Sequence, residues 1–566
     1  MFWKRRKTYK DHDLSPEDVL IDAHNMPHFN EHQFEGRMAG RIPSRRGYAL
    51  IALFALIALV FGGQLYSLQV LRGPALASQS AENHLDHHTL FTDRGIIYDR
   101  TGRELAWNTP QEDDFNHREY IDAAGFGHVL GYISYPKRDA DGNYYDTSYA
   151  GVAGAEAAFN GALEGEQGVK IIERDAHMDV LSENTITDPV DGEDISLSID
   201  AALQEAMHGY IRDIAERVGF VGGAGVIMNV NTGEILTLTN YPEYSPQVLV
   251  DGDDEEMIVS YQGGNTPFLN RATQGLYTPG SIVKPYVALG VLSEDIINPR
   301  DRIRSTGEIR VENPYEEGEY SVFKDWKAHG LVDLVDALAV SSNVYFYVVG
   351  GGHNGQEGLG ISRLVRYFDA FDIGTPTGFI LNESSGTIPS PAWKSDTFNG
   401  EPWRLGDTYH TAIGQYGFQV TPLQMTRAMS GIVHEGEMIT PHLRAGEQER
   451  LRDVDVNIES EAYGWVKRGL RESVLRGTAR GLNVPYINIA AKTGTAEVGN
   501  EREKVHSWVT GYFPYDDPQY VFTVVMERGD RSNLVGATAV MRQVFDWMRV
   551  NTPEYLGLSG RNQEEN

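Results

Sequence analysis

The longest hydrophobic run of the chain lies near its start and contains no charged residue. It extends from Tyr48 to Leu71, enough residues for one helix to cross a hydrocarbon core about 30 Å thick. A cleaved signal peptide is the alternative, because Ala75-Leu76-Ala77 resembles a cleavage site. The run is longer than a signal peptide needs and begins late in the sequence. The pattern therefore predicts a membrane-spanning helix at residues 47–71.

Basic residues on the two sides of this run predict its orientation. Only Arg72 stands directly after it, whereas four arginines precede it: Arg37, Arg41, Arg45 and Arg46. By the positive-inside rule, residues 1–46 form a cytoplasmic tail and the rest of the chain faces outward. We expect a single-pass protein of the inner or plasma membrane.

Beyond the apolar run, the period of the hydrophobic positions changes twice. Residues 72–195 mix short strand-like runs with polar turns, which is typical of a small accessory domain. Residues 196–552 resemble an α/β (α+β) domain with an antiparallel sheet and helices, followed by a C-terminal tail at 553–566. The elements expected there are a hairpin at 223–230 and 234–240, helical stretches near 281–293 and 331–349, strands at 506–513 and 520–527, and an amphipathic helix at 534–550.

Composition and charge exclude several classes of function. With 41% hydrophobic and 10% aromatic residues, the chain can bury a large core. The absence of cysteine excludes disulfides, thiolate-bound metals and a cysteine nucleophile. The formal charge of -31, with no basic stripe, argues against nucleic acid as a partner.

Three short motifs in the larger domain suggest one active site. In the first, Ser281 follows Pro279-Gly280 and should start a helix, with Lys284 one turn along on the same face. A serine hydroxyl becomes a good nucleophile when a nearby base takes its proton, and a lysine with a lowered pKa can be that base. The spacing alone is weak evidence, because two other pairs share it: Ser134 with Lys137, and Ser321 with Lys324.

The other two motifs offer a proton relay and groups that bind substrate. Ser341-Ser342-Asn343 supplies a hydroxyl that can pass on a proton and a carboxamide that can hold an amide. In Lys492-Thr493-Gly494-Thr495, the glycine permits close approach of the backbone and the threonines can bind a carboxylate. The charge of Lys492 would also lower the pKa of Lys284. A decoy, Ser182-Glu183-Asn184, lies upstream in the accessory domain.

Serine-lysine, Ser-x-Asn and Lys-Thr-Gly in this order are the set found in penicillin-binding proteins and β-lactamases. Most of the chain, from residue 48 to 550, resembles the class B penicillin-binding proteins, and most closely their elongation-type branch. The accessory domain resembles that family's pedestal, or dimerisation-like, domain through Arg94-Gly95 with Asp99-Arg100 and through Gly154-Ala155-Glu156. Residues 323–347 and 406–424 resemble the elongation-type branch more than its division-type relatives.

The resemblance implies a serine-type D-Ala-D-Ala transpeptidase that cross-links peptidoglycan stem peptides and binds β-lactam antibiotics covalently. Ser281 would be the nucleophile, Lys284 the base and Ser341 the proton shuttle. Asn343 would bind the stem-peptide amide, and the backbone N–H groups of Ser281 and Thr495 would hold the oxyanion. Recognition of the terminal carboxylate would fall to Lys492, Thr493 and Thr495, with Gly494 between them. The implied partner is a polytopic glycosyltransferase of the elongation machinery.

The sequence departs from the family in two places. The segment between Pro110 and Gly127 is short, so the pedestal is expected to be reduced. Some relatives bind zinc beside the active site through aspartates, a histidine and a cysteine. Here His329 matches, but Ser342 replaces the cysteine and Phe323 replaces one aspartate. We expect no metal and no cofactor.

Three alternatives remain open. A division-type class B protein would share all three motifs. A β-lactamase would share them too but needs a deacylating base and no membrane pedestal. A β-lactam-sensing receptor usually has several membrane spans and a protease motif, and neither is found in the sequence.

Overall fold

A computed structural model describes residues 44–76, 85–111, 114–140, 144–174, 180–313, 316, 318–447, 451–499 and 503–558. Almost all of the expected cytoplasmic tail, residues 1–46, therefore lies outside the described residues, as does the end of the C-terminal tail. The chain divides into two compact units: Met1–Asp86 with Glu173–Ser182, and His87–Ile172 with Glu183–Asn566.

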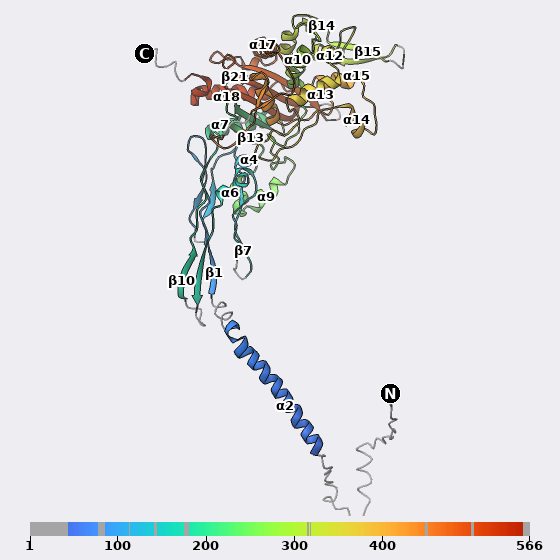
Figure 1. The fold of residues 1–566 in the computed structure, drawn as a ribbon. Coiled ribbons are helices and arrows are strands. Elements are labelled where there is room, and N and C mark those ends of the chain that lie inside the picture. Colours follow the sequence, from blue (N-terminus) through green and yellow to red (C-terminus); the bar gives the residue numbers. More distant parts are fainter. Residues whose placement is uncertain are drawn as a thin grey trace, which may run out of the picture. The chain divides into compact units, whose positions relative to one another are not determined.

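The first unit contains the apolar helix that the sequence predicts (Figure 1). It comprises α2 (Ser44–Tyr66), which continues directly as the π-helix η3 (Ser67–Leu71). Gly47–Leu71 is long and apolar enough to cross a membrane, and no other helix in the described part of the chain meets that test. Its apolar side chains are exposed, as Leu59 is at 74%. The prediction of one apolar spanning-length helix here is confirmed.

The accessory domain is built of short strands and turns, as its sequence predicts. Four strands form a sheet in the order β11-β2-β3-β4. The strands of the whole accessory domain are β1 (Leu85–Leu90), β2 (Ile97–Tyr98), β3 (Glu104–Thr109), β4 (His117–Tyr120), β5 (Ile133–Ser134), β6 (Lys137–Arg138), β7 (Tyr144–Asp146), β8 (Ala150–Gly151), β9 (Gly168–Arg174), β10 (Val180–Thr187) and β11 (Ile195–Ser196). Its helices are α4 (Gly127–Leu130), α5 (Gly154–Ala158) and α6 (Asn160–Leu163).

A buried ion cluster joins the two pedestal motifs of this domain. The Glu156 carboxylate accepts hydrogen bonds from Arg94 Nε at 2.6 Å and from Arg118 Nε at 2.8 Å. All three side chains are almost completely buried. Because loss of one partner would leave a buried charge unpaired, this cluster fixes the segments around Arg94 and Glu156 together.

The larger domain centres on a five-stranded antiparallel sheet in the order β13-β12-β22-β21-β20. The strands are β12 (Gly222–Asn229), β13 (Ile235–Tyr241), β20 (Ala490–Val498), β21 (Lys504–Phe513) and β22 (Tyr520–Asp530). The hairpin and both late strands predicted from the alternating pattern are present, and β20 is an edge strand. The expected α+β class with an antiparallel sheet is confirmed.

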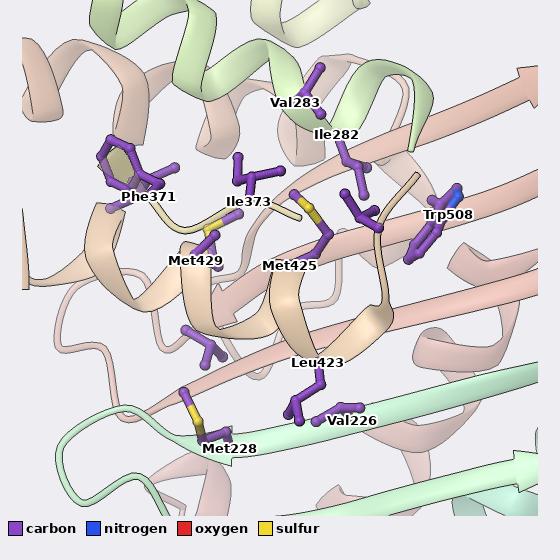
Figure 2. Packing of buried hydrophobic residues seen from close by; sticks show 14 of the residues in the cluster. Val226, Met228, Ile282, Val283, Phe371, Ile373, Leu423, Met425, Met429 and Trp508 are labelled. Carbon is purple, nitrogen blue, oxygen red and sulfur yellow. The ribbon is translucent and has the colours of Figure 1, made fainter. Parts of the chain in front are cut away.

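Helices cover both faces of this sheet because its side chains alternate. Ile227 of β12 belongs to the cluster of α7 (Ala201–Val218) and α18 (Ala537–Asn551), which pack on each other. Val226 and Met228 face the opposite way, toward α16 (Pro422–Val433). Figure 2 shows Leu423 of α16 beside Val226, and Met425 of the same helix near Ile282 and Trp508.

The remaining elements surround these two layers. They are α8 (Pro246–Asp251), α9 (Glu255–Tyr261), η4 (Gly280–Val283), α10 (Lys284–Ser293), β14 (Ile303–Ser305), β15 (Glu308–Glu312), β16 (Tyr320–Lys324), β17 (Gly330–Val332), α11 (Leu334–Val340), α12 (Asn343–Gly351), α13 (Ile361–Ala370), α14 (Pro391–Thr397), α15 (Leu405–Ala412), β18 (Glu437–Ile439), β19 (Leu451–Asp453), α17 (Ser460–Arg476), η5 (Arg480–Leu482) and η6 (Pro553–Leu556).

The helical stretch expected at 331–349 is wrong in one respect, because it is two helices preceded by a strand. Asp333 caps α11 by accepting a hydrogen bond from Asp336 N at 2.9 Å. The helix ends at Ser341, whose φ of 57° is left-handed, and Ser342 caps α12 through Tyr345 N at 3.3 Å. Polar side chains that bind nearby backbone groups interrupt the helix at this point.

Candidate active site

Ser281 lies on a short 3-10 helix, η4, that leads directly into α10. The turn requires Gly280, whose φ is +56° and whose added Cβ would meet the Thr495 carbonyl oxygen at 2.8 Å. With three residues per turn in a 3-10 helix, Ser281 and Lys284 share one face. Ser281 is half-buried and Lys284 is fully buried.

The other serine-lysine pairs lack this geometry. Ser134 and Lys137 lie in two separate strands, β5 and β6. Ser321 and Lys324 lie within β16, where positions three apart point to opposite faces. Of the three serine-lysine pairs, therefore, the pair of Ser281 and Lys284 is the one that shares a helical face.

The amino group of Lys284 contacts the second motif directly. Its Nζ donates to Asn343 Oδ1 at 2.7 Å and to the Ser341 carbonyl oxygen at 2.9 Å, and lies 3.4 Å from Ser341 Oγ. Burial lowers the pKa of Lys284 from 10.5 to about 7, against an opposing contribution from the charge of Asp325. A lysine with this pKa is neutral for much of the time near pH 7, so it can accept a proton.

The Ser341 hydroxyl lies between two amino groups. Lys492 Nζ donates to Ser341 Oγ at 2.8 Å and to the Thr493 carbonyl oxygen at 2.8 Å. Burial lowers the pKa of Lys492 well below its usual value, and the nearby Lys284 lowers it further. The sequence led us to expect that Lys492 lowers the pKa of Lys284, but burial causes that shift, and the effect between the lysines is found on Lys492 instead.

The third motif occupies the edge strand β20, next to η4. Gly494 is needed for this approach, because a Cβ there would meet the Pro279 carbonyl oxygen at 2.7 Å and Ile282 Cγ2 at 2.9 Å. Thr493 is half-buried and Thr495 is exposed. The strand therefore carries Thr493 and Thr495 next to the 3-10 helix that contains Ser281.

Two further residues of this region were missed by the sequence reasoning. Thr478 accepts a hydrogen bond from Thr493 Oγ1 at 2.6 Å, and its backbone N donates to Ala339 O at 3.1 Å, which links the third motif to α11. Asp325 accepts a hydrogen bond from Ser342 Oγ at 2.8 Å. A Gly-Thr pair after a long helix was the one signal for Thr478. Asp325 had no signal apart from lying within a family-like stretch.

The zinc set of some relatives does not fit the residues present here. His329 Nε2 lies 3.7 Å from Asp325 Oδ1, but Ser342 uses its hydroxyl on the same carboxylate. Phe323 packs its ring against Tyr347 and Tyr409. Within the described residues, no three His, Asp or Glu side chains gather closely enough to hold a metal.

The three motifs bring together groups of the kind that acyl transfer through a serine ester uses. Three distant segments of the chain contribute these groups. They are the Ser281 hydroxyl with buried Lys284 on the same face, the Ser341 hydroxyl between two amino groups with the Asn343 carboxamide, and the threonine-lined edge of β20. The arrangement is suited to a substrate that carries an amide and a carboxylate.

Comparisons with known proteins agree with this chemistry. The family described as the penicillin-binding protein transpeptidase domain matches residues 223–546, and the penicillin-binding protein dimerisation domain matches residues 112–197. The peptidoglycan D,D-transpeptidase MrdA of Acinetobacter baumannii is 31% identical over 75% of this chain. The chain spans 64% of that relative's length.

Solved structures give the same answer. The complex between penicillin-binding protein 2 and MreC from Helicobacter pylori is similar with a TM-score of 0.69 at 26% identity, over 82% of this chain and 99% of that one. One chain of a peptidoglycan synthase complex that coordinates polymerization and crosslinking is similar to this chain. The TM-score is 0.69 at 27% identity, over 91% of this chain and 99% of the other. With its apolar N-terminal helix, the chain is a membrane protein, and it belongs to the class B penicillin-binding proteins, in their elongation-type branch.

Proposed function

We propose that the protein cross-links stem peptides through an acyl-enzyme on Ser281 during cell-wall elongation. The observation that carries the proposal is the position of the Ser341 hydroxyl, 2.8 Å from Lys492 Nζ and 3.4 Å from Lys284 Nζ. This position supports the role of Ser341 as a proton relay beside Lys284, the proposed base for Ser281.

Acylation begins when neutral Lys284 takes the proton of the Ser281 hydroxyl. The oxygen attacks the carbonyl carbon of the D-Ala-D-Ala peptide bond, and the backbone N–H groups of Ser281 and Thr495 stabilise the oxyanion. As the C–N bond breaks, Ser341 passes its proton to the departing amine and takes in return the proton that Lys284 removed from Ser281, so terminal D-Ala leaves and a serine ester remains. Lys284 thereby returns to the neutral form that its burial favours.

Substrate recognition uses the groups that surround this path. Asn343 binds the stem-peptide amide, while Lys492, Thr493 and Thr495 receive the terminal carboxylate, which Gly494 lets approach the strand. An amine of a neighbouring stem peptide then attacks the ester and restores the Ser281 hydroxyl. A β-lactam carries the same amide and carboxylate around a strained carbonyl and forms the same ester.

The proposed topology places residues 1–46 in the cytoplasm and the catalytic domain outside the inner or plasma membrane. The four arginines before the apolar helix support this orientation. For a partner, we propose a polytopic glycosyltransferase of the elongation machinery that makes the glycan strands. The similarity to a protein of a peptidoglycan synthase complex supports this assignment.

Peptide mapping after fluorescent penicillin labelling tests the nucleophile. One adduct per chain is expected on the peptide that contains Ser281, and Ser281→Ala should not be labelled. Ser321→Ala, at the decoy pair on β16, is the matched control and should be labelled as the wild type is. An adduct on Ser321, or labelling of Ser281→Ala, would remove Ser281 from the mechanism.

Depletion in a rod-shaped host tests the branch and the single activity. Loss of the protein, or Ser281→Ala in its place, should round the cells, whereas filaments would indicate a division-type role. Purified full-length protein should cross-link added nascent glycan and fail to polymerise lipid-linked precursor without a partner. Polymerisation by the protein alone would contradict the division of labour proposed here.

A further inference from the structure

The turn that carries Ser341 is held in an unfavourable backbone conformation. Ser341 has a φ of 57° and ψ of 41°, the left-handed region that residues with a Cβ seldom adopt. It ends α11, and the next residue, Ser342, already caps α12. Contacts from outside the two helices must therefore stabilise this turn, because its own backbone preference opposes it.

Asp325 provides these contacts on the C-terminal side of the turn. Its Oδ2 accepts hydrogen bonds from Ser342 Oγ at 2.8 Å, from Val344 N at 3.0 Å and from Ser305 Oγ at 3.3 Å. The carboxylate side chain is completely buried. One oxygen atom therefore binds the residues on either side of Asn343 and ties them to β14.

The next residue holds the N-terminal side of the same turn. Trp326 Nε1 donates to the Val340 carbonyl oxygen at 3.2 Å, directly before Ser341. The backbone of Asp325 is fixed independently, because its N donates to Gly307 O at 2.8 Å. Residues 325 and 326 therefore bracket the turn from a loop that is anchored to other elements.

We propose that Asp325 is a positioning residue for the reaction: its carboxylate fixes the turn that places the Ser341 hydroxyl between the two lysines and the Asn343 carboxamide on Lys284. This inference rests on the proposed roles of Ser281, Ser341 and Asn343. Asp325 acts through the turn and does not touch the substrate. Its second effect is electrostatic, because its charge opposes the lowering of the pKa of Lys284.

The test compares Asp325→Ala and Asp325→Asn with Asp333→Ala in the full-length, detergent-solubilised protein. Asp333 is a matched control, because it also caps a helix of this region, α11, through Asp336 N at 2.9 Å, but has no contact with Ser341 to Asn343 among the hydrogen bonds of the described residues. The readouts are the second-order acylation rate constant with a fluorescent penicillin, its pH dependence, and the melting temperature.

Asp325→Ala should acylate at least ~10-fold more slowly than the wild type, because small displacements of catalytic groups have large effects on rate. Asp325→Asn should keep a rate within about threefold of the wild type, because its carboxamide oxygen can still accept the two shorter hydrogen bonds, from Ser342 Oγ and Val344 N. Asp333→Ala should lower the melting temperature with little change in rate. A wild-type rate in Asp325→Ala, or an equal loss in Asp333→Ala, would overturn the proposal.

The pH dependence tests the electrostatic effect of Asp325 and remains informative if Asp325→Ala does not fold. The charged or titratable groups facing Lys284 are Asp325, Lys492 and His329. Loss of the negative charge in Asp325→Asn should move the acidic limb of the acylation profile to lower pH, and an unmoved limb would contradict the electrostatic effect of Asp325 on Lys284. If wild-type protein is not labelled on Ser281, the proposed function itself fails. If it is labelled and the Asp325 variants match it, only this inference fails.

Discussion

The protonation of Lys284 predicts the pH at which the enzyme becomes active. Burial lowers the pKa of this lysine to about 7 from its usual 10.5. At pH 7.5, about three quarters of the molecules would then hold the neutral base, against roughly 0.1% for an unshifted lysine. The structure thus increases the fraction of active base several hundredfold.

The assay is the second-order acylation rate constant with a fluorescent penicillin, measured from pH 5.5 to 9.5. The rate should rise about tenfold per pH unit below pH 7 and level off above it, because deprotonation of one group controls the reaction. Lys284→Arg should lose at least ~1000-fold at pH 7.5, since a guanidinium keeps its proton throughout this range.

Lys394 is the matched control, because it is another buried lysine and forms an ion pair with Asp407 at 2.7 Å. Lys394→Arg should leave the acidic limb at the same pH. A wild-type profile that rises only above pH 9 would refute the role of burial. Substantial acylation by Lys284→Arg would remove this lysine as the base.

Three further predictions concern strand β20 and a buried carboxyl. Gly494→Ala should slow acylation by at least ~10-fold and lower the melting temperature, because its Cβ would lie 2.7 Å from the Pro279 carbonyl oxygen. A variant with the same acylation rate and melting curve as the wild type would contradict this close approach. Lys492→Ala should slow acylation by penicillin, because Ser341 loses its 2.8 Å hydrogen-bond donor. Peptide mapping should still find the adduct on Ser281, and an unchanged acylation rate constant would exclude Lys492 from the active site. Burial raises the pKa of Glu243 from 4.5 to about 8, so its protonated form stabilises the fold below pH 4.5 and this contribution, up to ~5 kcal/mol, is lost as the pH rises to 8. Glu243→Gln should flatten the fall in melting temperature between pH 5 and 8, and an equally steep fall would show that other groups cause it.

The sequence determined those features that depend on neighbouring residues. The uncharged run before Leu71 specifies an apolar helix, since its length matches a bilayer and no charge interrupts it. The alternating pattern of side chains in β21 and β22 specifies strands, because one face of each strand packs on the layer of α7 and α18 and the other face packs on the opposite layer. The order of the three motifs was enough to indicate the family.

Only the tertiary structure decided how those motifs work together. Lys284, Ser341 and Lys492 are far apart in sequence, and their separation in space depends on how α10, α11 and β20 pack. The lowered pKa of Lys284 is a property of burial, which no local pattern records. The break at Ser341 lies within the helical stretch expected at 331–349. Its cap, Ser342, is local, but Asp325 and Trp326, which hold the turn, lie outside both helices. A sequence specifies which groups are present, but their charge state and geometry are set by contacts that form only when the whole domain has folded.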